Sequence, residues 1–147
     1  MKRRSVLSLL GLTFSIVVLV HQSAAEDHVA VSWQTDAESA WRSAHSAQKP
    51  LLLYVSMDNC VYCRKMEKNT FADQAVVSDI EESFVAASVA AESRSPLVRK
   101  LRVRSFPTTV IISPSAGVLA YIRGYVEPKE FRADLATAVK KEEAKRP

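Results

Sequence analysis

Short apolar runs of strand length recur along the chain and are separated by more polar segments. Such runs, bounded by turn or helical residues, predict buried strands. Residues Ser113 to Gly117 have turn chemistry and lie between the last two runs, which predicts a hairpin there. The predicted strands are Val29–Trp33, Leu51–Val55, Val85–Val89, Thr108–Ile112 and Val118–Ile122.

Between these strands, apolar residues recur every three or four positions, as they do on one face of a helix. Thr35 with Glu38 predicts a capping box at the first helix, and Ser95-Pro96 predicts the start of a later one. The order β-α-β-α-β-α-β-β-α predicts an α/β fold, with a central mixed sheet and helices on both faces. The helical stripes are Ala37, Ala40, Trp41, Ala44 and Ala47; Ala72, Val76, Ile80 and Phe84; Leu97, Val98 and Leu101; and Phe131, Leu135, Ala138 and Val139.

The first 25 residues have a different pattern. A basic start (Lys2 to Arg4) is followed by a mostly apolar run, Val6 to Val20, and then by the small residues Ser23-Ala24-Ala25. This pattern predicts a secretory signal peptide cleaved after Ala25, which leaves residues 26–147 as one domain in the periplasm or outside the cell. An uncleaved anchor is the alternative, but the run is shorter than the ~20 residues that span a membrane comfortably.

Loss of the signal peptide changes the charge of the chain. The 20 lysines and arginines include three in the signal, so 17 basic residues remain against 16 acidic ones. A nearly neutral chain does not indicate binding to nucleic acid. About 122 residues are enough for one compact domain and too few for two. We expect a monomer that does not bind nucleic acid.

The chain has two cysteines, and both lie in the sequence Cys60-Val61-Tyr62-Cys63. A predicted strand ends just before them and a breaker-free helical segment follows. At a helix start the pair can close a small disulfide, and the helix end favours the first sulfur as thiolate. A C-x-x-C near a β-α-β pattern is typical of a redox motif. A structural disulfide and half of a zinc site are the alternatives, although zinc needs four ligands and no second cysteine pair exists.

Several segments together resemble the thioredoxin superfamily, and within it the exported branch that includes the C-terminal domain of the periplasmic disulfide reductase DsbD. The resemblance spans Trp33 to Lys140. It is carried by Lys49-Pro50 before Leu51, the Cys60/Cys63 pair, Lys65-Met66-Glu67-Lys68 with Thr70-Phe71, and Arg104-Ser105-Phe106-Pro107-Thr108.

The resemblance implies thiol-disulfide exchange through a mixed disulfide. Cys60 is then the attacking thiolate and Cys63 the resolving thiol. Pro107 is expected to be cis and to lie against the disulfide, and with the backbone beside Phe106 it would hold an extended segment of a partner protein. The redox-active disulfide itself carries the electrons, so no dissociable cofactor and no metal is expected.

The chain departs from the family pattern at two positions near the cysteines. Tyr54 stands six residues before the first cysteine, where many thioredoxins carry a buried carboxylate, and a phenol with a usual pKa of about 10 is a poor base. Asn59 replaces a frequent Trp and could cap the helix. Asp58 is a candidate proton relay, although a solvated loop carboxylate is the simpler interpretation.

The direction of exchange follows from what surrounds Cys60. The Val61-Tyr62 dipeptide has no histidine to stabilise the Cys60 anion, which favours a reductant or isomerase over a strong oxidant. Such a protein outside the cytoplasm needs an electron donor, for which we expect a membrane or periplasmic reductase, and its other partners are protein thiols and disulfides. Two alternatives stay open: a protein that handles Cu(I) with the C-x-x-C thiolates, and a non-catalytic binding module with the same fold.

Overall fold

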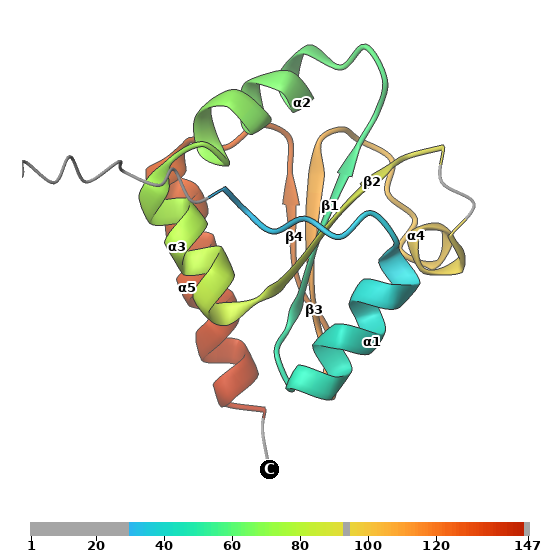
Figure 1. Cartoon of the computed structure of the whole chain (residues 1–147), viewed down its shortest axis with the longest axis vertical. Coiled ribbons are helices and arrows are strands. Elements are labelled where there is room, and N and C mark those ends of the chain that lie inside the picture. The colour runs from blue at the N-terminus through green and yellow to red at the C-terminus, as the bar shows by residue number, and fades with distance from the viewer. Residues whose placement is uncertain (1–29, 93–94, 146–147) are drawn as a thin grey trace, which may run out of the picture.

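A four-stranded mixed sheet lies at the centre of the computed structural model, which describes residues 30–92 and 95–145 (Figure 1). The strand order is β2-β1-β3-β4. β1 is parallel to β2 and antiparallel to β3, and β3 is antiparallel to β4. The predicted mixed sheet and closing hairpin are therefore confirmed. The strands are β1 (Leu51–Ser56), β2 (Val85–Ala90), β3 (Thr108–Ser113) and β4 (Gly117–Arg123).

Helices cover both faces of this sheet, as the sequence predicts. α3 and α5 lie on one face, and α1 and α4 lie on the other (Figure 1). A short helix, α2, is continued by one turn of π-helix, η1, at one end of the sheet. The helices are α1 (Ala37–Ala47), α2 (Val61–Lys65), η1 (Met66–Thr70), α3 (Gln74–Ser83), α4 (Pro96–Lys100) and α5 (Pro128–Glu143).

The central strand β1 contributes to the cores on both faces. Its side chains alternate, so Leu52 and Tyr54 pack with residues of α3 and α5. Leu51, Leu53 and Val55 pack with residues of α1 and α4. A strand that is buried on both sides has an apolar sequence throughout, which is why Leu51 to Val55 shows no alternation. The strand therefore holds its carboxyl end, and the loop that follows, on a rigid base.

The predicted first strand is wrong over its described part, residues 30–33. Gln34 forms one parallel bridge with Ala87, in which its carbonyl accepts from the amide of Ser88 at 2.9 Å. The ladder does not extend towards the N-terminus because the amide of Ser32 donates instead to the side chain of Glu81, at 2.6 Å. Val29 lies outside the described residues.

The predicted capping box at Thr35 is also wrong. Asp36 is the N-cap of α1, and its carboxylate accepts from the amide of Ser39 at 2.6 Å. The Glu38 carboxylate accepts instead from the hydroxyl of Ser95 at 2.6 Å and the amide of Leu97 at 3.2 Å. These hydrogen bonds, led by that from Ser95, lower the pKa of Glu38. Glu38 therefore ties α1 to the start of α4.

The predicted apolar faces of the helices are buried at their central positions, but two of the predicted end positions are exposed. Ala72 is exposed and precedes α3, because Asp73 caps that helix by accepting from the amides of Ala75 and Val76, both at 3.0 Å. Ala47 is exposed at the last position of α1. The predicted cap of α4 is confirmed, since its Ser95 hydroxyl accepts from the amide of Val98.

The predicted signal peptide, residues 1–25, lies outside the described residues, and its cleavage stays a prediction. Among residues 30–92 and 95–145, no helix combines the length and the apolar character needed to cross a membrane. The expectation of export therefore depends on the sequence of the N-terminal segment alone.

Candidate active site

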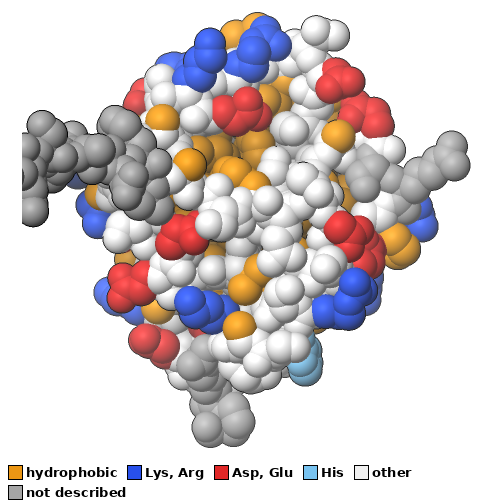
Figure 2. Space-filling model, in the orientation of Figure 1, with side chains coloured by type: hydrophobic (Ala, Val, Ile, Leu, Met, Phe, Trp, Pro, Cys, Tyr) orange, Lys and Arg blue, Asp and Glu red, His pale blue; other side chains and the backbone are white. Residues whose placement is uncertain are grey.

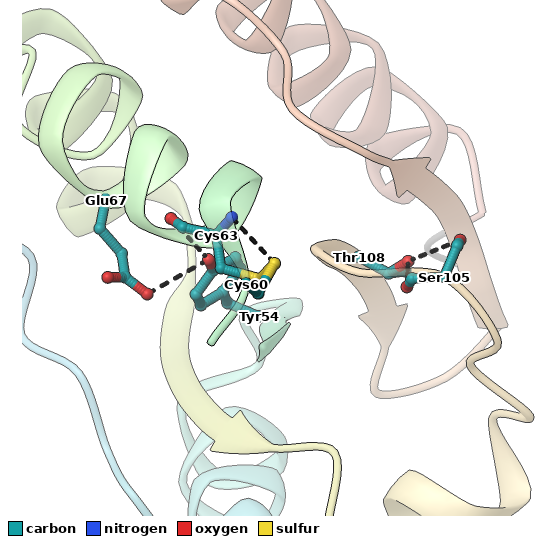
Figure 3. The surroundings of a disulfide bond; sticks show 6 residues. All are labelled: Tyr54, Cys60, Cys63, Glu67, Ser105 and Thr108. Carbon is teal, nitrogen blue, oxygen red and sulfur yellow. Dashed lines mark hydrogen bonds between the residues drawn. A yellow bond between two sulfur atoms is a disulfide. The ribbon is translucent and has the colours of Figure 1, made fainter. Parts of the chain in front are cut away.

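The two cysteines form a disulfide at the turn between β1 and α2 (Figure 3). The sulfur atoms lie 2.13 Å apart and the Cα atoms 5.2 Å apart. Cys60 is the N-cap of α2, and its sulfur accepts a hydrogen bond from the amide of Cys63 at 3.1 Å. In the reduced protein, an amide at the start of a helix would favour the thiolate form of Cys60. The predicted position of the pair, between a strand and a helix, is confirmed.

The two sulfur positions differ in how accessible they are. Cys63 is buried, with 3 % of its surface exposed, whereas Cys60 is partly exposed. The intervening residues Val61 and Tyr62 are 67 % and 61 % exposed. A partner protein can therefore approach Cys60 across an open apolar surface, while Cys63 faces the interior.

Tyr54 lies behind Cys63, on the core side of the disulfide (Figure 3). Its hydroxyl is 3.2 Å from the backbone carbonyl of Cys63 and 3.3 Å from Oε1 of Glu67. The hydroxyl has one proton, so these two acceptors share it. Burial, and then the charge and hydrogen bond of Glu67, raise the pKa of Tyr54 well above its usual value. Tyr54 is therefore a neutral hydrogen-bond donor at physiological pH, as its reference pKa predicts.

Glu67 belongs to the same cluster, although sequence reasoning does not identify it as a site residue. It follows Cys63 by four positions, and residues at that spacing share a helix face. The π-helical turn η1 begins at Met66, whose carbonyl accepts from the amide of Phe71. Single π-helical turns are frequent at functional sites. Glu67 thus supplies a carboxylate beside the tyrosine that occupies the family's carboxylate position.

An open groove of about 660 Å³ lies next to Tyr54 and Glu67. Trp33, Tyr54 and Phe71 line it, with ring centroids 4.9 Å apart for Trp33–Phe71 and for Tyr54–Phe71. Figure 2 shows hydrophobic side chains in a recess on this face of the molecule. Glu67 lines the groove and is exposed to solvent. Its carboxylate therefore contacts both solvent and the Tyr54 hydroxyl, which is hydrogen-bonded to the Cys63 carbonyl.

The turn before β3 lies on the other side of the disulfide from Glu67 (Figure 3). The Phe106–Pro107 peptide is cis, as the family resemblance implies. Thr108 pairs with Val55 of β1, so this turn and the C-x-x-C loop share one end of the sheet. The Pro107 carbonyl accepts from the amide of Gly124 at 2.8 Å, which fixes the turn to the end of β4.

Phe106 has a buried side and an open side. Its ring packs against the core under α1 and α4. Among the described residues, its backbone N–H and C=O have no hydrogen-bond partner. An extended chain lying along the turn could use both groups.

Asp58 and Asn59 lie in the loop between β1 and α2. Asn59 does not cap the helix as the sequence suggests, because Cys60 takes that position. Asn59 instead adopts a left-handed conformation with φ of 57°, which asparagine tolerates better than most residues. Asp58 is exposed and makes no hydrogen bond or ion pair with any described residue. Its role as a proton relay stays a prediction.

The described residues do not assemble a recognisable metal site. Among them, no group of three or more His, Cys, Asp or Glu side chains could hold a metal ion. His45 is exposed on α1 and contacts the ring of Trp41, with centroids 6.2 Å apart.

A mixed sheet with helices on both faces and a C-x-x-C disulfide at a helix start are typical of a thioredoxin-type oxidoreductase domain. The chain belongs to the thioredoxin-like domain family, whose model matches residues 37–138. It is 30 % identical over 92 residues to the thiol:disulfide interchange protein DsbD of Pectobacterium atrosepticum, and 28 % identical over 117 residues to that of Actinobacillus pleuropneumoniae. These alignments cover 59 % and 76 % of this chain but only 16 % and 20 % of the relatives.

Solved structures support the same fold. A thioredoxin from Thermus thermophilus superposes with a TM-score of 0.71 and 26 % identity, over 79 % of this chain and 92 % of that one. The oxidised C-terminal domain of DsbD from Neisseria meningitidis gives a TM-score of 0.55 at 16 % identity, over 78 % of this chain and all of that domain. The family resemblance inferred from the sequence is thus confirmed.

Proposed function

We propose that this chain is an exported thiol-disulfide oxidoreductase that exchanges the Cys60–Cys63 disulfide with protein partners. The observation that carries the proposal is the asymmetry of the pair: Cys60 is partly exposed at the helix start, and Cys63 is buried one turn further on. This arrangement supports one attacking and one resolving sulfur. The similarity to DsbD proteins, which are named for thiol:disulfide interchange, supports the same reaction.

The reductive reaction proceeds in two exchanges. The Cys60 thiolate attacks one sulfur of a partner disulfide, which forms a mixed disulfide and releases the other partner sulfur as a thiolate that takes a proton. Cys63 then loses its proton and attacks the Cys60 sulfur, which releases the second partner thiol and closes the Cys60–Cys63 disulfide. Two electrons pass from this chain to the partner.

The proton of Cys63 needs an acceptor during the second exchange. Tyr54 stays neutral and cannot accept it at physiological pH. Glu67 is a carboxylate whose Oε1 lies 3.3 Å from the Tyr54 hydroxyl, which in turn lies 3.2 Å from the Cys63 carbonyl. The groove beside them gives access to solvent. These contacts end at the Cys63 carbonyl and not at its sulfur, so a proton passing from Cys63 to Glu67 would travel through solvent in the groove. On this basis we assign the Glu67 carboxylate to this step, in place of the missing one at position 54.

The partner polypeptide binds along the turn before β3. Within residues 30–92 and 95–145, the N–H and C=O of Phe106 have no hydrogen-bond partner, which suits an extended segment that adds two backbone hydrogen bonds. Pro107 shapes this turn, and the hydrogen bond of its carbonyl to Gly124 holds it in place. Exposed Val61 and Tyr62 supply an apolar surface next to Cys60.

The chain acts as a reductant or isomerase, and a membrane or periplasmic reductase regenerates its thiols. The absence of histidine between the cysteines supports this direction. The predicted signal peptide supports export. An exported reductant becomes oxidised as it reacts, and it therefore needs an electron donor that reduces it again.

Two measurements on residues 26–147 test the proposal. The reduced protein should reduce the disulfides of insulin, and the equilibrium of Cys60–Cys63 with glutathione should give a potential nearer to about −270 mV than to about −120 mV. A reduction potential near about −120 mV would instead indicate that the protein oxidises its partners. A stable Cu(I) complex with no exchange of insulin disulfides would replace the proposal with metal handling.

A further inference from the structure

Charge is distributed unevenly along the described chain. Residues 95–126, from the start of α4 to just beyond β4, contain five basic residues and no acidic one. Residues 30–92 contain nine acidic and five basic residues, and residues 127–145 contain five of each. The near-neutral total therefore hides one segment with a net charge of +5. Its basic residues are Arg99, Lys100, Arg102, Arg104 and Arg123.

The fold brings this segment next to the candidate active site. Arg104 precedes Pro107 by three residues, and Arg123 pairs with Thr108 in the β3–β4 ladder. The hydroxyl of Tyr121 donates to the carbonyl of Leu101 at 3.4 Å, so the end of α4 lies beside β4. We use the name basic surface for four exposed side chains: Arg104 and Arg123 beside the Phe106–Pro107 turn, and Lys100 and Arg102 at the end of α4 that precedes it.

The basic surface is not neutralised from within the described residues. None of its four side chains forms an ion pair there; Arg123 instead lies 4.8 Å from the ring centroid of Tyr121. Two carboxylates on adjoining elements interact with other groups. Glu38 is hydrogen-bonded to Ser95 and Leu97 at the start of α4, and Glu127 lies 3.8 Å from the Lys65 ammonium group.

We propose that the basic surface selects redox partners that carry acidic side chains beside their reacting cysteine. This inference rests on the proposed function, because it concerns proteins that exchange a disulfide with Cys60. A partner segment lying along Phe106 passes near Arg104, three residues before Pro107, and Arg123, which pairs with Thr108 in the ladder. Two exposed acidic residues, Asp58 in the C-x-x-C loop and Glu92 just after β2, reduce but do not cancel the charge of the four basic side chains.

The physical effect is electrostatic steering of the encounter. Charges interact over a Debye length of about 10 Å at 0.1 M salt, so acidic groups flanking a partner cysteine are attracted before contact. Complementary charge raises association rates by about 10- to 1,000-fold at low ionic strength. A partner with basic flanks is repelled by the same surface.

The experiment compares three disulfide substrates with the reduced protein. Two are disulfide-linked peptides with the same cysteine core, one flanked by Asp and Glu and the other by Lys and Arg; the third is uncharged bis(2-hydroxyethyl) disulfide. Second-order rate constants are measured at about 0.01 M and about 1 M salt, where the Debye length is about 30 Å and about 3 Å. We expect the acidic peptide to react at least about tenfold faster at low salt, and the ratio to approach one at high salt.

Charge reversal identifies the surface. Lys100→Glu with Arg104→Glu should remove or invert the peptide preference and leave the rate with the uncharged disulfide unchanged. Lys140→Glu with Lys145→Glu is the matched control, because it changes the net charge equally at the far end of α5 (Figure 1). That control should keep the preference for the acidic peptide. Thermal unfolding checks folding, and Lys100→Gln with Arg104→Gln repeats the test if the reversal variant is unstable.

Each failure has a separate meaning. Equal rates for the two peptides at low salt, with the uncharged disulfide still reduced, would overturn this inference and leave the proposed function standing. Failure to reduce any of the three substrates would refute the proposed function. A third outcome would also overturn the proposal. If the two peptides react at equal rates, and the wild type sediments with phosphatidylglycerol vesicles whereas the variant with Lys100→Glu and Arg104→Glu does not, the basic surface binds an anionic membrane.

Discussion

Replacement of Tyr54 by Phe isolates the hydroxyl group behind the disulfide. The ring stays in the core, where it contacts Trp33 at 5.9 Å and Phe71 at 4.9 Å between centroids. The substitution removes the hydrogen bonds from the hydroxyl to the Cys63 carbonyl and to Glu67. Any effect then comes from the polar contacts and not from a cavity.

The expected loss of unfolding free energy is modest. A typical hydrogen bond contributes about 0.5–1.5 kcal/mol net, and more is lost only when a buried partner is left unsatisfied. The Cys63 carbonyl still accepts from the amide of Met66, and the exposed Glu67 carboxylate can be hydrated. We therefore expect Tyr54→Phe to lower the unfolding free energy of the oxidised protein by about 1 kcal/mol.

The hydroxyl also adds a pH dependence with a defined sign. Because the pKa of Tyr54 is raised in the folded protein, its contribution is complete below the unfolded pKa of about 10 and is lost as pH rises above it. Wild type should lose stability over that alkaline range, and Tyr54→Phe should lose less.

Urea unfolding, followed by circular dichroism at neutral and alkaline pH, measures both effects. Tyr62→Phe is the matched control, since Tyr62 is 61 % exposed and should show no change. A Tyr54→Phe protein as stable as wild type at neutral pH would contradict the assigned hydrogen bonds. A loss well above about 3 kcal/mol would indicate repacking of the ring, because it exceeds what these bonds explain.

Three further variants test other parts of the structure. Glu67→Gln should slow closure of the Cys60–Cys63 disulfide from a mixed disulfide, measured by quenched-flow trapping, with little effect on the first attack; an unchanged closure rate would remove Glu67 from the mechanism. Phe131→Ala, at a fully buried position, should cost about 3–5 kcal/mol in urea unfolding, whereas a cost below about 1 kcal/mol would contradict its place in the core. The pKa of Glu38 is lowered in the folded protein, so the unfolded chain binds the proton first and the wild type loses stability as pH falls below the usual glutamate pKa of 4.5. Glu38→Gln should lose less stability over this range. Parallel curves of stability against pH for the two proteins would show that the Ser95 contact has no energetic effect.

The sequence predicts well the elements that are set by uniform burial or by a local turn. Leu51 to Val55 is recognisable because both faces of β1 are buried, and the hairpin is recognisable because Ser113 accepts from the amides of Ser115 and Ala116 in its turn. The C-x-x-C pair is located correctly because a strand ends before it and a helix begins at it.

The errors arise where a neighbouring segment decides the local structure. Residues 30–33 have strand composition, but Glu81 takes the amide of Ser32 and the ladder stops at Gln34. Glu38 has the spacing of a capping box, but Ser95, far away in sequence, captures its carboxylate. No local pattern contains these contacts.

The candidate site shows the same division. Cys60, Cys63 and Pro107 follow from motif and resemblance, whereas Glu67 becomes visible only when the fold places Tyr54 within hydrogen-bond distance of it. Helical spacing from Cys63 would have suggested the same face, but not the contact with a tyrosine on β1.

The most direct test of the central claim is mixed-disulfide trapping with single-cysteine variants. Reduced Cys63→Ser and Cys60→Ser proteins are incubated with a peptide disulfide and quenched in acid, and the covalent adducts are quantified by intact mass. The partial exposure of Cys60 and the burial of Cys63 predict a stable adduct with Cys63→Ser and little adduct with Cys60→Ser. Equal trapping by both variants, or preferential trapping by Cys60→Ser, would contradict the assignment of Cys60 as the attacking sulfur.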